Sequence, residues 1–311
     1  MRQTNKIRKG IAWLLCTVLV LGILPMLPQM SMQISAAENA ASVFVDGVEL
    51  HAGSQEYFKN GDTADSGATG TYEDHSAYYD TAGELWLNNL EAHTIKADGN
   101  LIIYVCNNQA TNTNIVTATQ NETAIEVTGY LTIRYGGYGG GTGSLTVESD
   151  GKEAIQAGSG MTVSDGVEVK ARAKSGATAI SSGGVLKIDG IRTKLEAAGD
   201  GSTGKGIFAQ QSIYVKNSAV LTAFGGAAAY ESPSGIDKSG YGYEDYNVFT
   251  GDAAPGTQAA QDTVLDGYKY IRIEPTGVAN VKTLTELQAA AQNQYISPVS
   301  YTHLTLPTIL R

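Results

Sequence analysis

The segment TAIEVTGYLTIRY, residues 123–135, decides the fold of this chain. It carries one isoleucine, a few small and polar residues around a glycine, and then two apolar residues that alternate with polar ones. Alternation with a period of two over a short run is typical of a strand with one buried face, and glycine between such runs indicates a turn. The segment therefore predicts two short strands joined by a tight corner.

The same pattern occurs five times along the chain. The leading isoleucines are Ile95, Ile125, Ile155, Ile180 and Ile207, so the steps are 30, 30, 25 and 27 residues. The alternating pairs are Leu101/Ile103, Leu131/Ile133, Met161/Val163, Leu186/Ile188 and Ile213/Val215, and a third apolar position follows at Ile115, Leu145, Val169, Leu195 and Leu221. Such a unit cannot bury its apolar face alone, whereas stacked units form parallel sheets around a continuous core. We expect an all-β fold, a parallel β-helix (β-solenoid) of about five coils; an antiparallel sandwich is the alternative.

Both ends of such a stack need capping strands and loops, because they expose unpaired strand edges. On the N-terminal side, SVFVDGVEL predicts a hairpin with an Asp-Gly turn, and ELWLNNLEA predicts a strand with Leu85 and Leu87 on one face and Trp86 on the other. On the C-terminal side, residues 230–267 are rich in Gly, Ser, Pro and Tyr, and YKYIRIEP predicts a closing strand.

The order of these segments resembles a family of exported bacterial proteins. VFVDGVEL, ELWLNNLEA, the repeated coils, YNVFTGDAA and YKYIRIEP, over about residues 42–275, are similar to adhesin-like proteins of Gram-positive and gut bacteria described as containing a carbohydrate-binding domain. The resemblance implies a right-handed parallel β-helix of pectin-lyase-like architecture and a role in sugar binding. The repeated residues are core and turn residues, so they indicate the architecture and not the ligand.

The first 37 residues predict a signal peptide. A basic segment precedes the apolar run IAWLLCTVLVLGIL, and small residues near Ala37 predict cleavage there, which leaves a secreted or cell-surface protein. The run is short for a membrane span, so an uncleaved anchor is the less favoured alternative.

The remaining chain is acidic. Without the four basic residues of the signal peptide and Arg311, 16 of the 21 basic residues remain, together with all 31 acidic residues. Residues 38–298 therefore have a net charge of −15. This excess of negative charge argues against nucleic-acid and anionic-membrane partners. Cys106 is then the only cysteine, so no internal disulfide is expected, and a buried, inert thiol is favoured over a reactive one.

The last residues differ from the rest. GVANVKTLTELQAAAQNQ predicts a linker, a short strand and a helix, the start of a truncated second module. The ending VSYTHLTLPTILR lacks the features of a cell-wall sorting signal, and its back-translation resembles a DNA sequencing adaptor, so we expect it to be an artefact. The expected organisation is 1–37 signal peptide, 38–91 N-terminal strands and cap, 92–228 solenoid coils, 229–276 long loop and closing strand, 277–298 truncated module, and 299–311 artefact.

No catalytic constellation is evident in the sequence. A glycosidase of this shape needs paired carboxylates on neighbouring strands, and a lyase needs a basic residue with clustered acids. The acids Asp150, Asp165, Asp189 and Asp200 stand beside glycines, where turn formation explains them. We expect no catalytic residue, no metal ligand and no cofactor, although Asp62 with Asp65, or Glu244 with Asp245, leave calcium binding open.

Two tyrosine clusters in loops are the candidate ligand-binding residues. They are Tyr135 and Tyr138, followed by Tyr230, Tyr241, Tyr243 and Tyr246. Exposed aromatic faces stack on sugar rings, but the same residues could cap the open end of the solenoid. The expected function is a non-catalytic, exported module for carbohydrate binding or adhesion, with a glycan as partner and further C-terminal modules beyond this chain. The alternatives are a polysaccharide-active lyase or hydrolase and a purely structural spacer.

Overall fold

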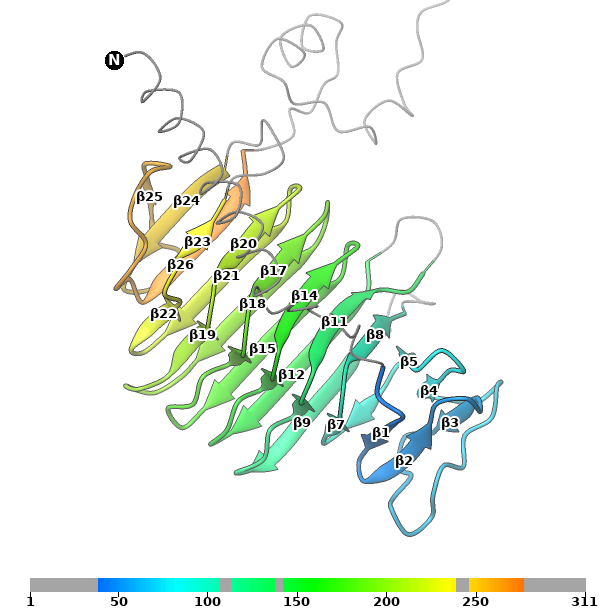
Figure 1. Ribbon diagram of the computed structural model, residues 1–311. Helices are drawn as coiled ribbons and strands as arrows, with labels where there is room; N and C mark the ends of the chain where they lie inside the picture. The colour runs from blue at the N-terminus through cyan, green and yellow to red at the C-terminus, as the bar shows by residue number, and fades with distance from the viewer. Residues whose placement is uncertain (1–38, 107–112, 138–141, 239–245, 277–311) are drawn as a thin grey trace, which may run out of the picture. The chain divides into compact units, whose positions relative to one another are not determined.

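The computed structural model of the chain describes residues 39–106, 113–137, 142–238 and 246–276. Its regular structure over these ranges consists of 26 strands in three sheets (Figure 1). In the described ranges no helix is long and apolar enough to cross a membrane. The predicted signal peptide, the truncated module and the C-terminal ending all lie outside the described residues.

Each coil contributes one strand to each sheet. In the coil that contains the opening segment, these are β10 (Ile125–Val127), β11 (Tyr130–Tyr135) and β12 (Ser144–Asp150). Each of them pairs in parallel with the equivalent strands of the preceding and following coils. The fold is therefore a parallel β-solenoid of about five turns, as the repeat predicted.

The three sheets are named here in the order in which a coil visits them. Sheet I holds β1 (Ser42–Val45), β2 (Val48–His51), β7 (Ile95–Ala97), β10, β13 (Ile155–Ala157), β16 (Ile180–Ser182), β19 (Lys205–Ala209) and β22 (Ala228–Glu231). Sheet II holds β3 (Glu56–Phe58), β4 (Ala77–Tyr79), β5 (Glu84–Leu87), β8 (Leu101–Val105), β11, β14 (Gly160–Ser164), β17 (Leu186–Asp189), β20 (Ile213–Lys216) and β23 (Ile236–Asp237). Sheet III holds β6 (Glu91–Ala92), β9 (Asn114–Gln120), β12, β15 (Glu168–Lys174), β18 (Lys194–Gly199), β21 (Val220–Gly225), β24 (Tyr246–Gly251), β25 (Thr257–Ala259) and β26 (Tyr270–Pro275).

The interior is filled by the apolar positions of the repeat. The five leading isoleucines are register partners from coil to coil, and so are the alternating pairs of sheet II. All of these side chains are buried. Adjacent coils therefore bury a continuous column of aliphatic side chains. This burial supplies the main apolar driving force for the fold.

One position of the predicted repeat is wrong. The sequence places Ile115 in the third apolar column with Leu145, but the register partner of Leu145 is Asn114. Asn114 and Val116 are buried, whereas Ile115 is half-buried on the outer side. The strand tolerates this one-residue shift because the amide of Asn114 accepts a hydrogen bond from the Leu90 N–H (3.0 Å) and donates one to the Ser144 carbonyl (3.3 Å).

The corners between sheets I and II pass close to one another from coil to coil. A Cβ atom on Gly183 would lie 1.8 Å from the carbonyl oxygen of Gly158 in the coil beside it. A side chain at this corner would push the two coils apart, so glycine is required there for steric reasons.

The caps follow the sequence prediction. At the N-terminal end, β1 and β2 form a hairpin through Asp46 and Gly47, both with positive φ, and β1 pairs antiparallel with β7. Strands β3, β4 and β5 extend sheet II beyond the first coil. At the other end, β26 pairs antiparallel with β21 and is covered in turn by β24 and β25 (Figure 1). Antiparallel strands therefore end sheets I and II at the N-terminal side and sheet III at the C-terminal side.

Candidate functional site

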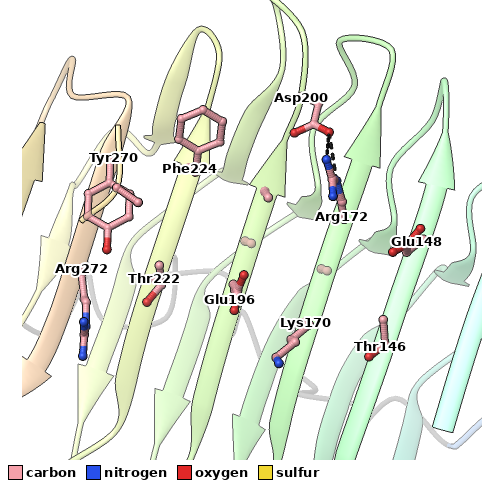
Figure 2. Close-up of a pocket in the computed structure, with 14 residues that line it drawn as sticks. Thr146, Glu148, Lys170, Arg172, Glu196, Asp200, Thr222, Phe224, Tyr270 and Arg272 are labelled. Atoms are coloured by element: carbon pink, nitrogen blue, oxygen red, sulfur yellow. Dashed lines mark hydrogen bonds and ion pairs between the residues drawn. The ribbon is translucent and has the colours of Figure 1, made fainter. Parts of the chain in front are cut away.

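A groove lies on the outer face of sheet III, across β12, β15, β18, β21 and β26 (Figure 2). It encloses about 580 Å³ and is open to solvent. The lining side chains are the outward residues that alternate with the buried ones on these strands. Two rows of register partners form it: Thr146, Lys170, Glu196, Thr222 and Arg272 in one, and Glu148, Arg172, Ala198, Phe224 and Tyr270 in the other.

The charged residues of the groove are mostly paired. Arg172 donates two hydrogen bonds to Asp200 at 2.9 and 2.6 Å, the bonds drawn in Figure 2. These bonds raise the pKa of the Arg172 guanidinium. Glu148 accepts a hydrogen bond from Lys174 at 3.1 Å. Asp200 thus does more than form a turn, because its carboxylate also holds a guanidinium over the groove.

Two aromatic rings close one end of the groove. Phe224 on β21 and Tyr270 on β26 are register partners, and Figure 2 shows their rings side by side above the sheet. Tyr270 is only 4 % exposed, with Gly256 packed on its ring, whereas Phe224 is half-buried. Phe224 therefore offers the aromatic surface that a ligand in the groove would touch.

The groove carries no stack of neighbouring carboxylates among its described residues. Glu196 has Lys170 and Thr222 as register partners, and Glu148 has Thr117 and Arg172. Every groove acid on a strand is therefore flanked by basic or neutral residues. This arrangement suits hydrogen bonding to polar ligands more than the paired-carboxylate chemistry of a glycosidase.

A second feature is an aromatic row on the outer face of sheet II. Trp86 on β5 stacks on Tyr78 of β4 (ring centroids 5.7 Å, 4° between planes) and on Tyr104 of β8 (4.0 Å, 8°). The Arg134 guanidinium covers Tyr104 at 4.4 Å, and Tyr57 of β3 packs against Tyr78 at 5.8 Å. Because each ring of the stack lies against its neighbours, the row joins the cap to the first coils and leaves few ring faces for a ligand.

Half-buried polar contacts hold this row in place. The indole N–H of Trp86 donates a hydrogen bond to Asp80 at 3.1 Å, and Arg134 lies 3.8 Å from the Glu84 carboxylate. Burial and the nearby Asp80 raise the pKa of Glu84. Burial likewise raises the pKa of Tyr78 to about 12. Sequence reasoning placed Trp86 on the outer face but missed the row, because the register of β3, β4 and β5 was not known.

Three of the six tyrosines singled out from the sequence lie in the described structure, each on a different strand: Tyr135 on β11, Tyr230 on β22 and Tyr246 on β24. Tyr230 and Tyr246 are 5 % and 3 % exposed, and Tyr230 donates a hydrogen bond to Asp266 at 2.5 Å, so neither ring offers a face to a ligand here. This placement matches the capping alternative for these two residues. Tyr135 is half-buried against the core. The other three candidates, Tyr138, Tyr241 and Tyr243, lie outside the described residues.

The described acids do not form a metal site. No group of three or more His, Cys, Asp or Glu that could hold a metal ion occurs in the described ranges. Asp62 instead accepts hydrogen bonds from the backbone N–H groups of Lys59 and Thr69, both at 2.9 Å. Glu244 and Asp245 lie outside the described residues.

Cys106 is buried as predicted, and burial raises the pKa of its thiol to about 11.

On β12, β15, β18 and β21 the groove residues recur about once per repeat, and this recurrence is the signal that the sequence offered. The two rows follow the buried position of the third column by one and three residues, as Lys170 and Arg172 follow Val169. In comparisons with known proteins, no protein family, curated protein or solved structure matches this chain. Fold and site thus define a β-solenoid with an open, mixed-charge groove on one sheet.

Proposed function

We propose that this chain is an exported, cell-surface or secreted β-solenoid module that binds carbohydrate without catalysing a reaction. The groove on sheet III is the proposed binding site. The observation that carries the proposal is the meeting of the half-buried Phe224 ring with hydrogen-bonding side chains such as Glu196 and Arg172 in one open groove.

This combination fits the chemistry of a sugar. The C–H face of a pyranose ring packs on an aromatic ring, while its hydroxyls exchange hydrogen bonds with carboxylates and guanidinium groups. Water-exposed grooves suit such ligands, because a sugar that keeps part of its hydration loses less on binding.

The shape of the groove favours a polymer over a small molecule. Five strands spaced about 4.8 Å apart give the groove a length of about 19 Å. A groove of this length that is open to solvent can hold several consecutive sugar units and let the rest of the polymer continue into solvent.

The sequence supports an extracellular setting for this activity. The first 37 residues have the pattern of a cleaved signal peptide, and the net charge of −15 for residues 38–298 suits a protein that does not bind nucleic acid. The likeness to adhesin-like bacterial β-helix proteins points in the same direction. The stiffness of a solenoid would hold the groove away from the cell.

A glycan array probed with the full-length chain tests the proposal. Selective binding to a subset of glycans is expected, and Phe224→Ala should weaken it about tenfold, since an aromatic contact of this kind contributes on the order of 1 kcal/mol or more. Phe208→Ala is the matched control, because Phe208 is a half-buried, outward ring on β19 of sheet I.

The array also separates the other interpretations. Loss of binding in Tyr241→Ala/Tyr243→Ala, with Phe224→Ala unaffected, would move the site to the long loop and contradict the groove. Silence of the unmodified chain across a broad array would reject carbohydrate binding and favour a structural spacer.

A further inference from the structure

We infer that the groove on sheet III selects uncharged, hydroxyl-rich polysaccharides over polymers of uronic acids, with Glu196 as the residue that accepts the ligand's hydroxyl donors. This inference deepens the proposed function and rests on it. Three observations carry it: the pairing of the groove cations, the isolation of Glu196, and the charge of the surrounding chain.

Every cation that lines the described groove already faces a carboxylate. Arg172 holds Asp200, Lys170 lies 3.4 Å from Glu168, and Arg272 pairs with Glu274. Lys174, just outside the groove, holds Glu148 at 3.1 Å. The groove lining itself contains equal numbers of positive and negative side chains. A carboxylate on the ligand would therefore find no cation that is free to neutralise it.

An anionic ligand would have to share one of these cations with its carboxylate partner or displace that partner. In either case the gain from the new ion pair is reduced by repulsion from the carboxylate already present, which stays within a few ångströms on the same sheet. The negative charge of the chain as a whole adds repulsion at low salt. A hydroxyl group meets none of these costs, because it hydrogen-bonds to the paired residues without separating them.

Glu196 differs from the other acids of the groove. Among the described residues it makes no ion pair, although Glu148 and Asp200 do. Its exposed carboxylate stands in the middle of its row, between Lys170 and Thr222, and Figure 2 shows it between the charged end and the aromatic end of the groove. A carboxylate accepts two hydrogen bonds side by side, which matches a pair of adjacent sugar hydroxyls.

The position of Glu196 also fixes the ligand's orientation. A sugar unit packed on Phe224, one strand away from Glu196, would bring its hydroxyl-bearing edge toward the carboxylate. The aromatic ring then supplies contact area, and the carboxylate discriminates between hydroxyl donors and acidic groups. A uronate directed at Glu196 would place two negative charges side by side, which is the most unfavourable arrangement.

Affinity electrophoresis of the full-length chain in native gels tests the inference. The gels contain either polygalacturonate or its fully methyl-esterified, neutral form of similar length, so the two polymers share one backbone and differ mainly in the carboxylate charge. We expect neutral polymers to retard the chain, and a small panel with glucan, mannan and xylan backbones extends this test. We expect no retardation by polygalacturonate, even at low salt.

The possible outcomes test the selectivity for neutral polymers separately from the proposed carbohydrate binding. Retardation by polygalacturonate, lost in Phe224→Ala and weakened by salt, would overturn the neutral selectivity and leave the proposed carbohydrate function standing. Failure of every polymer, neutral and acidic, would overturn the proposed function and the inference with it.

A pair of variants tests the role of Glu196. Glu196→Ala should weaken binding of the neutral polymer about tenfold, since hydrogen bonds to a charged acceptor are among the stronger ones. Glu126→Ala, on the outer face of β10 in sheet I, is the control and should bind like the unmodified chain. Tighter binding of polygalacturonate by Glu196→Lys would support the assignment. Unchanged binding of the neutral polymer by Glu196→Ala would overturn it.

Discussion

At the scale of single residues, two buried polar side chains explain features that hydrophobic patterning does not. Asn114 occupies a position where the other coils have Leu or Val, and its amide bridges the backbones of the coils on both sides. Asp62 organises the loop between β3 and β4 by accepting two backbone hydrogen bonds. Buried polar groups are tolerated when their hydrogen bonds are made, and removing one partner is costly.

Replacement of Asn114 by alanine should therefore destabilise the protein. The change leaves the Leu90 N–H and the Ser144 carbonyl without their partner, so we expect a loss of about 1–3 kcal/mol in the free energy of unfolding, measured in urea. Thr117→Ala, an exposed position on the same strand, is the control and should change stability by less than about 0.5 kcal/mol. Equal effects of the two variants would contradict a special role for Asn114.

Asp62 makes a pH-dependent contribution to stability. Its burial raises its pKa, but hydrogen bonds from Thr69 and Lys59 outweigh burial, so the folded pKa is below the ordinary value. A depressed carboxyl pKa stabilises the fold above the unfolded pKa of about 3.9, and this stabilisation is lost as the pH falls through the folded value.

Asp62→Asn should thus lower the free energy of unfolding by about 1–3 kcal/mol at neutral pH, and the difference should shrink under acid conditions. Urea unfolding at a series of pH values measures this difference. Asp65→Asn, in the same loop but exposed, is the control and should change the free energy of unfolding by less than about 0.5 kcal/mol. A deficit in Asp62→Asn that stays constant down to strongly acid pH would speak against the charge effect.

At the scale of elements, the aromatic row on sheet II connects the N-terminal cap to the solenoid. Trp86 stacks between a ring of the antiparallel cap and a ring of the first parallel coil. Cross-strand aromatic pairs of this kind contribute beyond the area they bury. The row thus stabilises the boundary where the pairing of sheet II changes from antiparallel to parallel.

Trp86→Ala should lower the free energy of unfolding by about 1–3 kcal/mol and raise hydrogen exchange first in β3, β4 and β5. Phe44→Ala provides the comparison, because Phe44 is an exposed aromatic residue on the outer face of β1. Hydrogen exchange followed by mass spectrometry distinguishes the two. A loss spread evenly over all coils would show that the row does not act at the cap.

At the scale of the whole molecule, the repeated core positions could be predicted from the sequence. The features that depend on strand register could not. The isoleucine column and the pairs of sheet II recur with little variation, so their stacking could be read directly. Ile115 was misplaced because apolarity alone does not reveal a one-residue shift that Asn114 compensates. The groove was missed because its residues, such as Thr146, Lys170 and Glu196, are scattered singly and meet only when the coils stack.

Tyrosine burial across the molecule predicts sensitivity to alkali. Burial raises the pKa values of Tyr78 and Tyr79 to about 12, against an ordinary value of about 10. In the unfolded state these two hydroxyls lose their protons at a lower pH than in the folded state. Their contribution to the free energy of unfolding should therefore be complete below about pH 10 and decline as the pH rises toward about 12. Urea midpoints together with tyrosinate absorbance follow this decline. A constant midpoint through that window would contradict the assigned burial.

Locating the bound glycan on the protein would show directly whether the groove on sheet III is the binding site. Hydroxyl-radical footprinting of the full-length chain, with the glycan selected by the array and a non-binding glycan as scavenger control, reports the protection of individual side chains. If the glycan binds in the groove, Phe224 and residues beside it on β18 and β21 should be protected, while Tyr135 and Phe208 should be unchanged. Protection that leaves Phe224 unaffected and falls instead on Tyr135, or on residues 239–245, would place the carbohydrate site elsewhere.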